Sequence, residues 1–210
     1  MLYYIDNIEK INTDNLLRYL SPERLEYQNR YRFEIDRRQS ILAFVLLRIA
    51  LAEEYGIFTT PIVGKSSTGK PYLIDHPEIC FNLSHCKKGV ACGVSDYEIG
   101  IDIQDYVPFD EGVAKQFMTH REIAVARNDP TDREFTRIWT LKESRGKRAG
   151  MGICYDLTST PAIEGRFEDG TISKCLMLQQ FAISVTAAAE IKMIKLSEKM
   201  FLEKCEMLIV

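Results

Sequence analysis

The sequence predicts an α+β fold in which helices are followed by a small sheet in each half of the chain. Helical patterns cover residues 21–55 and 132–148, and short strand-like runs follow each of them. Hydrophobic residues make up 46% of the chain and charged residues 27%, which is typical of a globular protein rather than a disordered one. With 210 residues, the chain can bury a core without disulfides or metal ions. The repeated order of elements suggests a duplication.

The first half is expected to open with a strand at residues 1–7 and to continue into a long helical region. Ser21 and the proline and glutamate after it form a typical helix start, with serine at the N-cap and proline at the first helical position. The helical pattern runs to about Tyr55 with a break near Asp36, and Gly56 fits a C-terminal stop. Short strands are then predicted at residues 71–74, 79–83, 90–95 and 99–103.

The second half repeats this order. Thr119 and Glu122 have the spacing of a capping box, which marks the start of a helix. A longer helix is expected from about Asp132 to Arg148. Strand-like runs follow at residues 163–167, 171–178, 181–187 and 192–196.

The charge and hydropathy patterns exclude two classes of partner. Twenty-seven basic and thirty acidic residues give a net charge of −3, whereas a nucleic-acid-binding protein normally has a basic excess. The longest strongly apolar run, residues 41–47, ends at Arg48 and is far too short to span a membrane. We therefore expect neither a nucleic-acid nor a membrane partner.

The six cysteines do not have the spacing of a zinc site. None of them forms a CxxC pair, and the three histidines do not complete a ligand set. The first residues, MLYYID, lack the basic and long apolar regions of a secretion signal. These features predict a cytoplasmic protein whose cysteines are reduced.

Four short segments are polar or contain glycine where a core strand or helix would be apolar. In chain order they are Gly69-Lys70-Pro71, Phe81–His85 (FNLSH), Ile99–Gln104 (IGIDIQ) and Trp139–Lys147 (WTLKESRGK).

The third segment carries a carboxylate inside an apolar strand. Alternation along a strand places Asp102 and Gln104 on one face and the neighbouring isoleucines on the other. A buried carboxylate is costly unless something pairs with it. Mg²⁺ would do so, because it commonly takes one or two carboxylates and completes its shell with waters and phosphates.

The fourth segment places Glu143 and Lys147 one turn apart on the same face of a helix. The ordinary interpretation of such a pair is a solvated surface salt bridge. Beside a metal ion and a pyrophosphate, the carboxylate would instead bind metal or accept a proton, and the ammonium would neutralise phosphate charge.

These four segments, in this order, resemble those of the 4′-phosphopantetheinyl transferases, and most closely the double-length, surfactin-synthetase-activating type. The family's hallmarks are (V/I)-G-(V/I)-D, matched by residues 99–102, and W/F-(S/C/T)-x-K-E-(A/S)-x-x-K, matched by residues 139–147. The two upstream segments match accessory motifs, and Gly150-Met151-Gly152 resembles a glycine-x-glycine after the second hallmark. The resemblance spans residues 21–152.

The resemblance implies an Mg²⁺-dependent transfer in which coenzyme A is the donor substrate. Its phosphopantetheine arm would move to a serine of an apo-acyl or peptidyl carrier protein, releasing adenosine 3′,5′-bisphosphate. Asp102, Gln104 and Glu143 would bind the metal, and Glu143 would also act as the general base. Lys147, as a catalytic and binding residue, and His85 would contact the phosphates of coenzyme A.

Further contacts to coenzyme A are implied for residues upstream. Lys70 and Pro71 would flank the adenine and ribose, and Ser84 would line the same pocket. The family carries cations for the 3′-phosphate in the region of Arg24, Arg30, Arg37 and Arg38, and we expect Arg24 and one of Arg37 and Arg38, with Arg38 preferred, to bind it. An ordinary solvated helix surface would equally explain them.

Two residues depart from the family pattern. Many members have glutamate where this chain has Gln104. Gly146 lies inside the expected catalytic helix, where a glycine costs about 1 kcal/mol relative to alanine. Neither change removes a hallmark residue.

The fold implied by the resemblance is a pseudo-duplicated 4′-phosphopantetheinyl transferase fold. Two similar halves, residues 1–105 and 106–210, would each pack helices on a small antiparallel sheet, with coenzyme A in the cleft between them. A monomer is expected because both halves lie in one chain. The alternative is a non-catalytic relative that binds coenzyme A or a nucleotide; a plain interaction protein would leave the polar strand ends unexplained.

Overall fold

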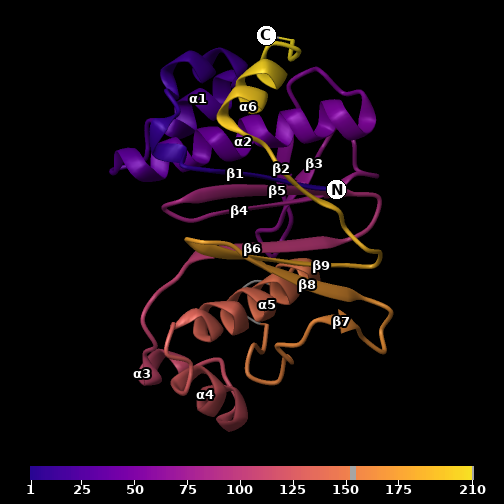
Figure 1. Cartoon of the computed structure of the whole chain (residues 1–210). Helices are drawn as coiled ribbons and strands as arrows, with labels where there is room; N and C mark the ends of the chain where they lie inside the picture. Colours follow the sequence, from indigo (N-terminus) through magenta and orange to yellow (C-terminus); the bar gives the residue numbers. More distant parts are fainter. Residues whose placement is uncertain (152–154, 210) are drawn as a thin grey trace.

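The computed structural model describes residues 1–151 and 155–209, and it arranges them in four layers (Figure 1). One outer layer consists of α1 (Pro22–Gln28), α2 (Glu34–Tyr55) and α6 (Glu198–Cys205), with the short 3₁₀ helices η1 (Ile8–Lys10) and η2 (Asp14–Tyr19). The other consists of α3 (Glu111–Ala114), α4 (His120–Arg127) and α5 (Arg133–Ala149). Two sheets lie between these layers, so the predicted α+β class is confirmed.

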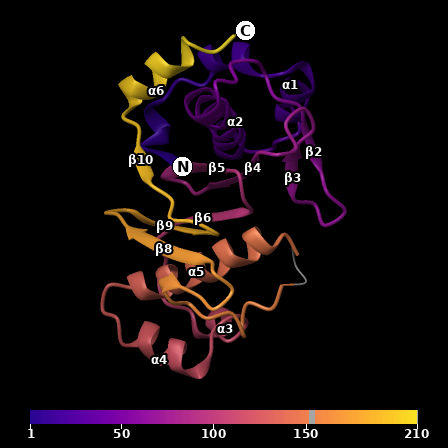
Figure 2. The ribbon, with the colours of Figure 1, turned by 90° about the vertical axis from the view of Figure 1, so that its right-hand side faces the viewer.

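Each of the two central sheets has four strands. The order in the first is β10 (Met193–Lys195), β1 (Leu2–Asp6), β5 (Gly89–Ser95) and β4 (Cys80–His85). The order in the second is β6 (Ile99–Asp105), β9 (Phe181–Ala187), β8 (Ile172–Met177) and β7 (Gly165–Arg166). All neighbours within these sheets are antiparallel except β1 and β10, which are parallel. A separate hairpin, β2 (Val63–Lys65) and β3 (Pro71–Leu73), lies at one side (Figure 2).

Most of the local signals in the sequence act as expected. The Ser21 side chain accepts a hydrogen bond from the backbone of Arg24, and Gly56 ends α2 with a φ of 67°. Thr119 and Glu122 form the predicted capping box at the start of α4. These ends form as predicted because each is satisfied by residues within one turn of the chain.

The break in the first helical region lies at residues 29–33 rather than near Asp36, so that part of the prediction was wrong. Asp36 and Glu34 instead form the acidic first turn of α2, where negative charge is favoured by the helix dipole. Helix α6 was not predicted, although Ser197 caps it by accepting a hydrogen bond from the backbone of Met200.

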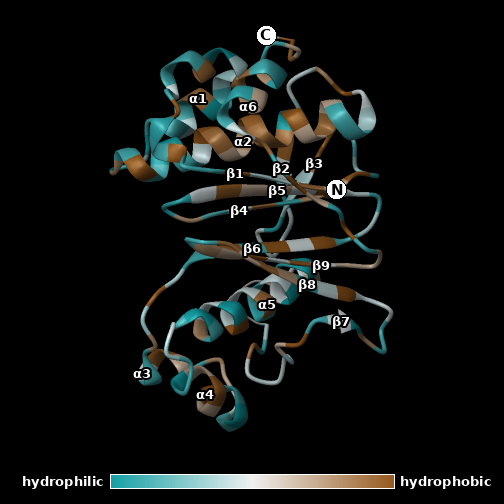
Figure 3. Ribbon diagram, in the orientation of Figure 1, coloured by the Kyte–Doolittle hydropathy of each residue, from teal (hydrophilic) through white to brown (hydrophobic). Residues whose placement is uncertain are grey.

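Strand alternation divides the apolar residues between separate cores. In β1, Tyr3 and Ile5 face the core under α2, whereas Leu2 and Tyr4 face the second sheet. Helix α2 itself is rich in apolar residues (Figure 3). The isoleucines of β6, Ile99, Ile101 and Ile103, join Leu2 and Tyr4 in this core between the sheets. The even-numbered residues of β6 are therefore left to face α5.

Side chains of β4 join the two sheets at the edge strand β6. The Asn82 carboxamide oxygen accepts a hydrogen bond of 2.7 Å from the backbone N–H of Ile101. The Ser84 hydroxyl accepts one of 3.2 Å from the backbone N–H of Ile103. Buried backbone donors need partners, and these two polar residues supply them where no strand continues the ladder.

The two halves share an order of elements: a strand, then helices, then antiparallel strands. The first strand of each, β1 and β6, pairs with the last, β5 and β9. However, β6 precedes residue 106 yet pairs in the second sheet, and β10 and α6 return to the first layer. The boundary between residues 1–105 and 106–210, and the duplication itself, stay predictions.

Within the part of the chain that the structure describes, no helix has both the length and the apolar character needed to cross a membrane. Cys80, Cys86, Cys92, Cys175 and Cys205 are free thiols. Cys154 and Gly152, the latter from the glycine-x-glycine match, lie outside the described residues.

The close packing of α5 on β6 generates a prediction about Gly100. A Cβ atom at this position would overlap the backbone oxygen of Ser144 and the backbone nitrogen of Arg148. Gly100→Ala should therefore lower the free energy of unfolding by about 1–3 kcal/mol or more, measured by urea denaturation. Gly112→Ala is the control, because its Cβ would meet only the exposed Asp110 carboxylate at 3.2 Å and no backbone atom, and it should change the stability by no more than about 1 kcal/mol in either direction. Equal stabilities of the two variants would contradict this account.

Candidate active site

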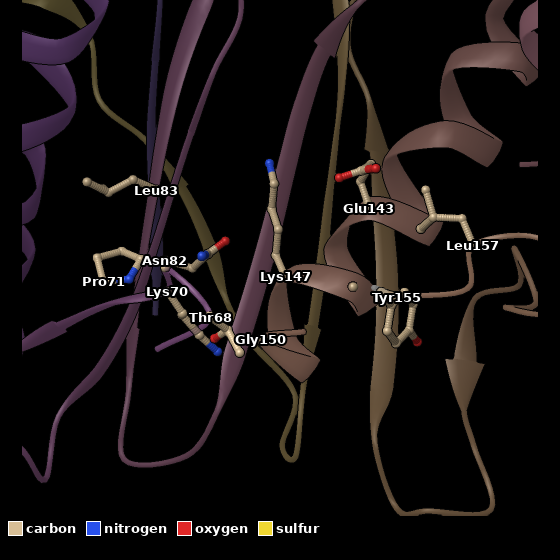
Figure 4. A pocket seen from close by; sticks show the side chains of 12 residues that line it. Thr68, Lys70, Pro71, Asn82, Leu83, Glu143, Lys147, Gly150, Tyr155 and Leu157 are labelled. Atoms are coloured by element: carbon tan, nitrogen blue, oxygen red, sulfur yellow. The ribbon is translucent and has the colours of Figure 1, made fainter. Parts of the chain in front are cut away.

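A cavity of about 600 Å³ lies between the β3–β4 side of the molecule and helix α5 (Figure 4). Its lining comprises Thr68, Gly69, Lys70, Pro71, Asn82, Leu83, Glu143, Gly146, Lys147, Gly150, Tyr155 and Leu157. All four segments singled out in the sequence meet at this cavity: three contribute lining residues, and the β6 segment lies directly behind Lys147.

Three predicted site residues form one hydrogen-bonded group behind the cavity. The ammonium of Lys147 lies 2.6 Å from the Asp102 carboxylate oxygen Oδ1 and 3.1 Å from the Ser84 hydroxyl. The Ser84 hydroxyl in turn donates to the same carboxylate oxygen at 3.0 Å. Strands β4 and β6 and helix α5 each supply one member, so the group forms only in the folded chain.

The Asp102 carboxylate is only half satisfied. The residue is 5% exposed, and its second oxygen, Oδ2, is buried without a hydrogen-bond partner. An unpaired buried carboxylate oxygen is costly, so this atom is a candidate ligand for a cation.

Glu143 supplies a second carboxylate near Asp102. Burial raises the pKa of Glu143, the negative charge of Asp102 raises it further, and the charge of Lys147 opposes both effects. Two carboxylates that repel each other in a partly buried site would be stabilised by a divalent cation.

The residues therefore fit a bound Mg²⁺ ion. In residues 1–151 and 155–209, no three His, Cys, Asp or Glu side chains come together as a metal cluster. Mg²⁺ does not require one, because it is usually held by one or two carboxylates together with waters and substrate phosphates. Asp102 and Glu143 satisfy that requirement.

Lys70 holds the β2–β3 hairpin against the second half of the molecule. The turn before it contains Gly69 with a φ of 86°, a conformation that favours glycine. The Lys70 ammonium contacts the Glu98 carboxylate and donates to the backbone oxygen of Arg148 at 2.9 Å. Lys70 and Pro71 thus lie at the cavity, and their contacts to the adenine and ribose stay predictions.

His85 lies at the end of β4 with its side chain exposed. Desolvation of the imidazole by the surrounding protein lowers the pKa of His85, and the positive charge of Lys147 lowers this pKa further. The turn that follows His85 is fixed by Asp105, whose carboxylate accepts the backbone N–H groups of Lys87 at 2.9 Å and Lys88 at 3.2 Å. This role of Asp105 could not be predicted from the sequence, because the contact joins two sheets.

Arg24, Arg38 and Gln104 are predicted site residues that neither line this cavity nor belong to the hydrogen-bonded group behind it. Arg24 donates to the Ser40 hydroxyl at 2.9 Å, and Arg38 donates to three backbone oxygens of residues 8–11. Gln104 lines a separate cavity of about 200 Å³ with Trp139 and Thr136 of α5, on the side of Asp102 away from Gly100. Their roles in binding coenzyme A or metal stay predictions.

Three residues of the cavity wall, Thr68, Tyr155 and Leu157, were not predicted from the sequence. The sequence indicated Gly146 only as a weak point in the helix, but the structure gives this glycine a packing role. A Cβ atom on Gly146 would lie 3.0 Å from Cδ1 of the Tyr155 ring. No local pattern marks Tyr155, because its neighbour Gly146 lies in another element.

Known proteins with similar sequences have been identified. The family model of the 4′-phosphopantetheinyl transferase superfamily matches residues 98–192. The chain is 33% identical over 153 residues to 4′-phosphopantetheinyl transferase psf-1 of Bacillus pumilus, covering 71% of this chain and 66% of that protein. It is 30% identical over 162 residues to 4′-phosphopantetheinyl transferase Sfp of Bacillus subtilis strain 168, covering 74% and 72%. It is 29% identical over 175 residues to 4′-phosphopantetheinyl transferase ffp of Bacillus subtilis, covering 81% and 77%.

The family match includes both hallmark segments, residues 99–102 and 139–147. The structure brings these segments together through the Asp102–Lys147 ion pair. The chain spans about two thirds of the length of psf-1 and more of the other two relatives. From these similarities and the shared residues, the chain belongs to the 4′-phosphopantetheinyl transferase superfamily.

Proposed function

We propose that this protein transfers the 4′-phosphopantetheine group of coenzyme A to a serine of an apo-acyl or peptidyl carrier protein. The observation that carries the proposal is the half-satisfied Asp102 carboxylate, which pairs with Lys147 behind the cavity that Lys147 and Glu143 line. Relatives named as 4′-phosphopantetheinyl transferases support catalysis rather than the non-catalytic alternative.

In the proposed step, the serine oxygen of the carrier attacks the phosphorus that bears the pantetheine. The new serine–phosphorus bond replaces the bond to the bridging oxygen of the pyrophosphate, and adenosine 3′,5′-bisphosphate leaves with that electron pair. Glu143 accepts the serine proton, directly or through a water. Its raised pKa makes it a stronger base than an exposed glutamate.

The other residues of this group would stabilise the negative charge of the phosphates. Phosphoryl transfer depends mainly on positioning and on cations around the phosphates. Asp102 and Glu143, with Gln104 as a third candidate, would hold Mg²⁺, which neutralises negative charge on the pyrophosphate when bound. Lys147 can turn its ammonium from Asp102 toward a phosphate, because its side chain is 31% exposed.

The remaining predicted residues would hold coenzyme A in the cleft. Lys70 and Pro71 would flank the adenine and ribose, and His85 and Ser84 would lie toward the phosphates. Arg24 and Arg38 stay candidates for the 3′-phosphate, at the far end of the ligand. We further propose a cytoplasmic monomer with no nucleic-acid or membrane partner.

The activity is tested by incubating the protein with coenzyme A, Mg²⁺ and several apo-carrier proteins of fatty-acid, polyketide and peptide synthesis. We expect at least one carrier to gain the mass of one phosphopantetheine on its serine, and EDTA to stop the reaction. Protein that binds coenzyme A but modifies none of the carriers would support the non-catalytic alternative.

The roles of the catalytic helix are tested with Glu143→Gln and Lys147→Ala. Loss of the base should cut turnover by at least about 10²-fold. Lys147→Ala should reduce both turnover and affinity for coenzyme A, because it removes charge pairing in the bound ground state. Lys174→Ala, at an exposed ion pair with Glu190, is the control and should match the unmodified protein. Small, equal effects at Glu143 and Lys147 would indicate an ordinary surface ion pair.

The metal-binding role of Gln104 is tested by titrating Mg²⁺ in two variants. Gln104→Glu should lower the Mg²⁺ concentration for half-maximal rate, because it adds an anionic ligand on the face of β6 that carries Asp102. Asp102→Asn should raise that concentration by a larger factor, since only one protein carboxylate would remain. An unchanged Mg²⁺ dependence in Gln104→Glu would remove residue 104 from the metal shell.

A further inference from the structure

The second hallmark contains a lysine, Lys142, to which the proposed reaction gives no role. Its side chain is completely buried, although it directly precedes the proposed base, Glu143. A buried ammonium is costly unless all of its donors are paired. The partners of Lys142 therefore indicate what this residue does.

The Lys142 ammonium binds the segment that follows α5. It donates to the backbone oxygens of Leu157 at 2.9 Å and Thr160 at 2.7 Å. It also lies 2.9 Å from the Glu122 carboxylate oxygen Oε2. An ammonium has three hydrogens to donate, so these partners use all of them, and none remains for a substrate.

Glu122 connects the same group to α4 and to the far end of the segment. Its Oε2 atom accepts the backbone N–H of Thr119 at 2.8 Å, which completes the capping box. Its Oε1 atom accepts the backbone N–H of Ala162 at 3.3 Å. Lys142 and Glu122 thus fix residues 157–162 against both helices.

Leu157, the first residue of the segment held in this way, forms one wall of the cavity together with Tyr155, two residues before it. Both line the cavity on the side of α5, opposite Pro71 and Leu83 (Figure 4). Consecutive residues of a helix point about 100° apart, so Lys142 can hold the segment while Glu143 faces the cavity. Because Lys142 binds the Leu157 backbone and is adjacent to Glu143, it fixes the position of Leu157 relative to Glu143.

We propose that Lys142 is a positioning residue that holds the Tyr155–Leu157 wall at a fixed distance from Glu143. Without its ammonium, residues 155–162 lose their anchor to α5, and the cavity widens beside the proposed base. The effect on transfer rests on the proposed function, whereas the anchoring of the segment does not.

The test uses Lys142→Met, which keeps an unbranched buried side chain but removes the donors. Glu122→Gln is a milder second variant, because glutamine can still complete the capping box. Lys115→Met is the matched control, since Lys115 pairs with Glu111 on the exposed surface. Hydrogen exchange of the peptide covering residues 155–162 measures the anchoring directly and needs no ligand.

Faster exchange is expected in residues 155–162 of Lys142→Met, a smaller increase in Glu122→Gln and none in Lys115→Met. Below the melting temperature, kcat of folded Lys142→Met should fall by about 10- to 100-fold, the scale of an ångström-sized misplacement. Binding of adenosine 3′,5′-bisphosphate, which lacks the pantetheine arm, should be unchanged in the same variant.

Two results would overturn the proposal. One is unchanged exchange of residues 155–162 in folded Lys142→Met, or in Glu122→Gln if the first variant does not fold. The other is a lowered melting temperature with unchanged kcat, which would make Lys142 purely structural. An unmodified protein that transfers nothing to any carrier would refute the proposed function, and the exchange measurement would still decide whether Lys142 anchors the wall.

Discussion

The site depends on one buried carboxylate at the place where two sheets and a helix meet. Asp102 lies on the edge strand β6, and its Oδ1 atom accepts hydrogen bonds from Ser84 of β4 and Lys147 of α5. Because the side chain is buried, removing Lys147 would leave its charge uncompensated, and removing Ser84 would cost it a hydrogen bond. The contacts of Asp102 therefore join β4, β6 and α5, and they also orient the residues that face the cavity.

The second carboxylate oxygen of Asp102 gives this junction a free group that could bind a cation. A fully paired carboxylate would be a structural ion pair and nothing more, whereas here Oδ2 has no partner among the described residues. The raised pKa of Glu143 reflects burial and the repulsion between the two carboxylates. The fold thus holds two negative groups together at a net cost, which a cation and a phosphorylated ligand would relieve.

The hallmark residues divide into those that pack in the core and those that face the candidate site. Gly100 lets α5 approach the backbone of β6, and Ile99 and Ile101 fill the core between the sheets. Lys142 is saturated by backbone oxygens and Glu122, although the residue after it faces the cavity. A short motif can therefore carry reactive groups and the groups that place them, because neighbouring residues in a strand or helix point in different directions.

The sequence by itself determined the helix ends at Ser21, Gly56 and Thr119, most of the strands, and the four segments that meet at the candidate site. Those features depend on periodicity and on partners within one turn, so they can be read locally. Only the tertiary structure decided that Lys142 is an anchor, that Tyr155 lines the cavity and that Gln104 lies in a separate one. These depend on contacts between distant elements, and local periodicity carries no information about which elements meet.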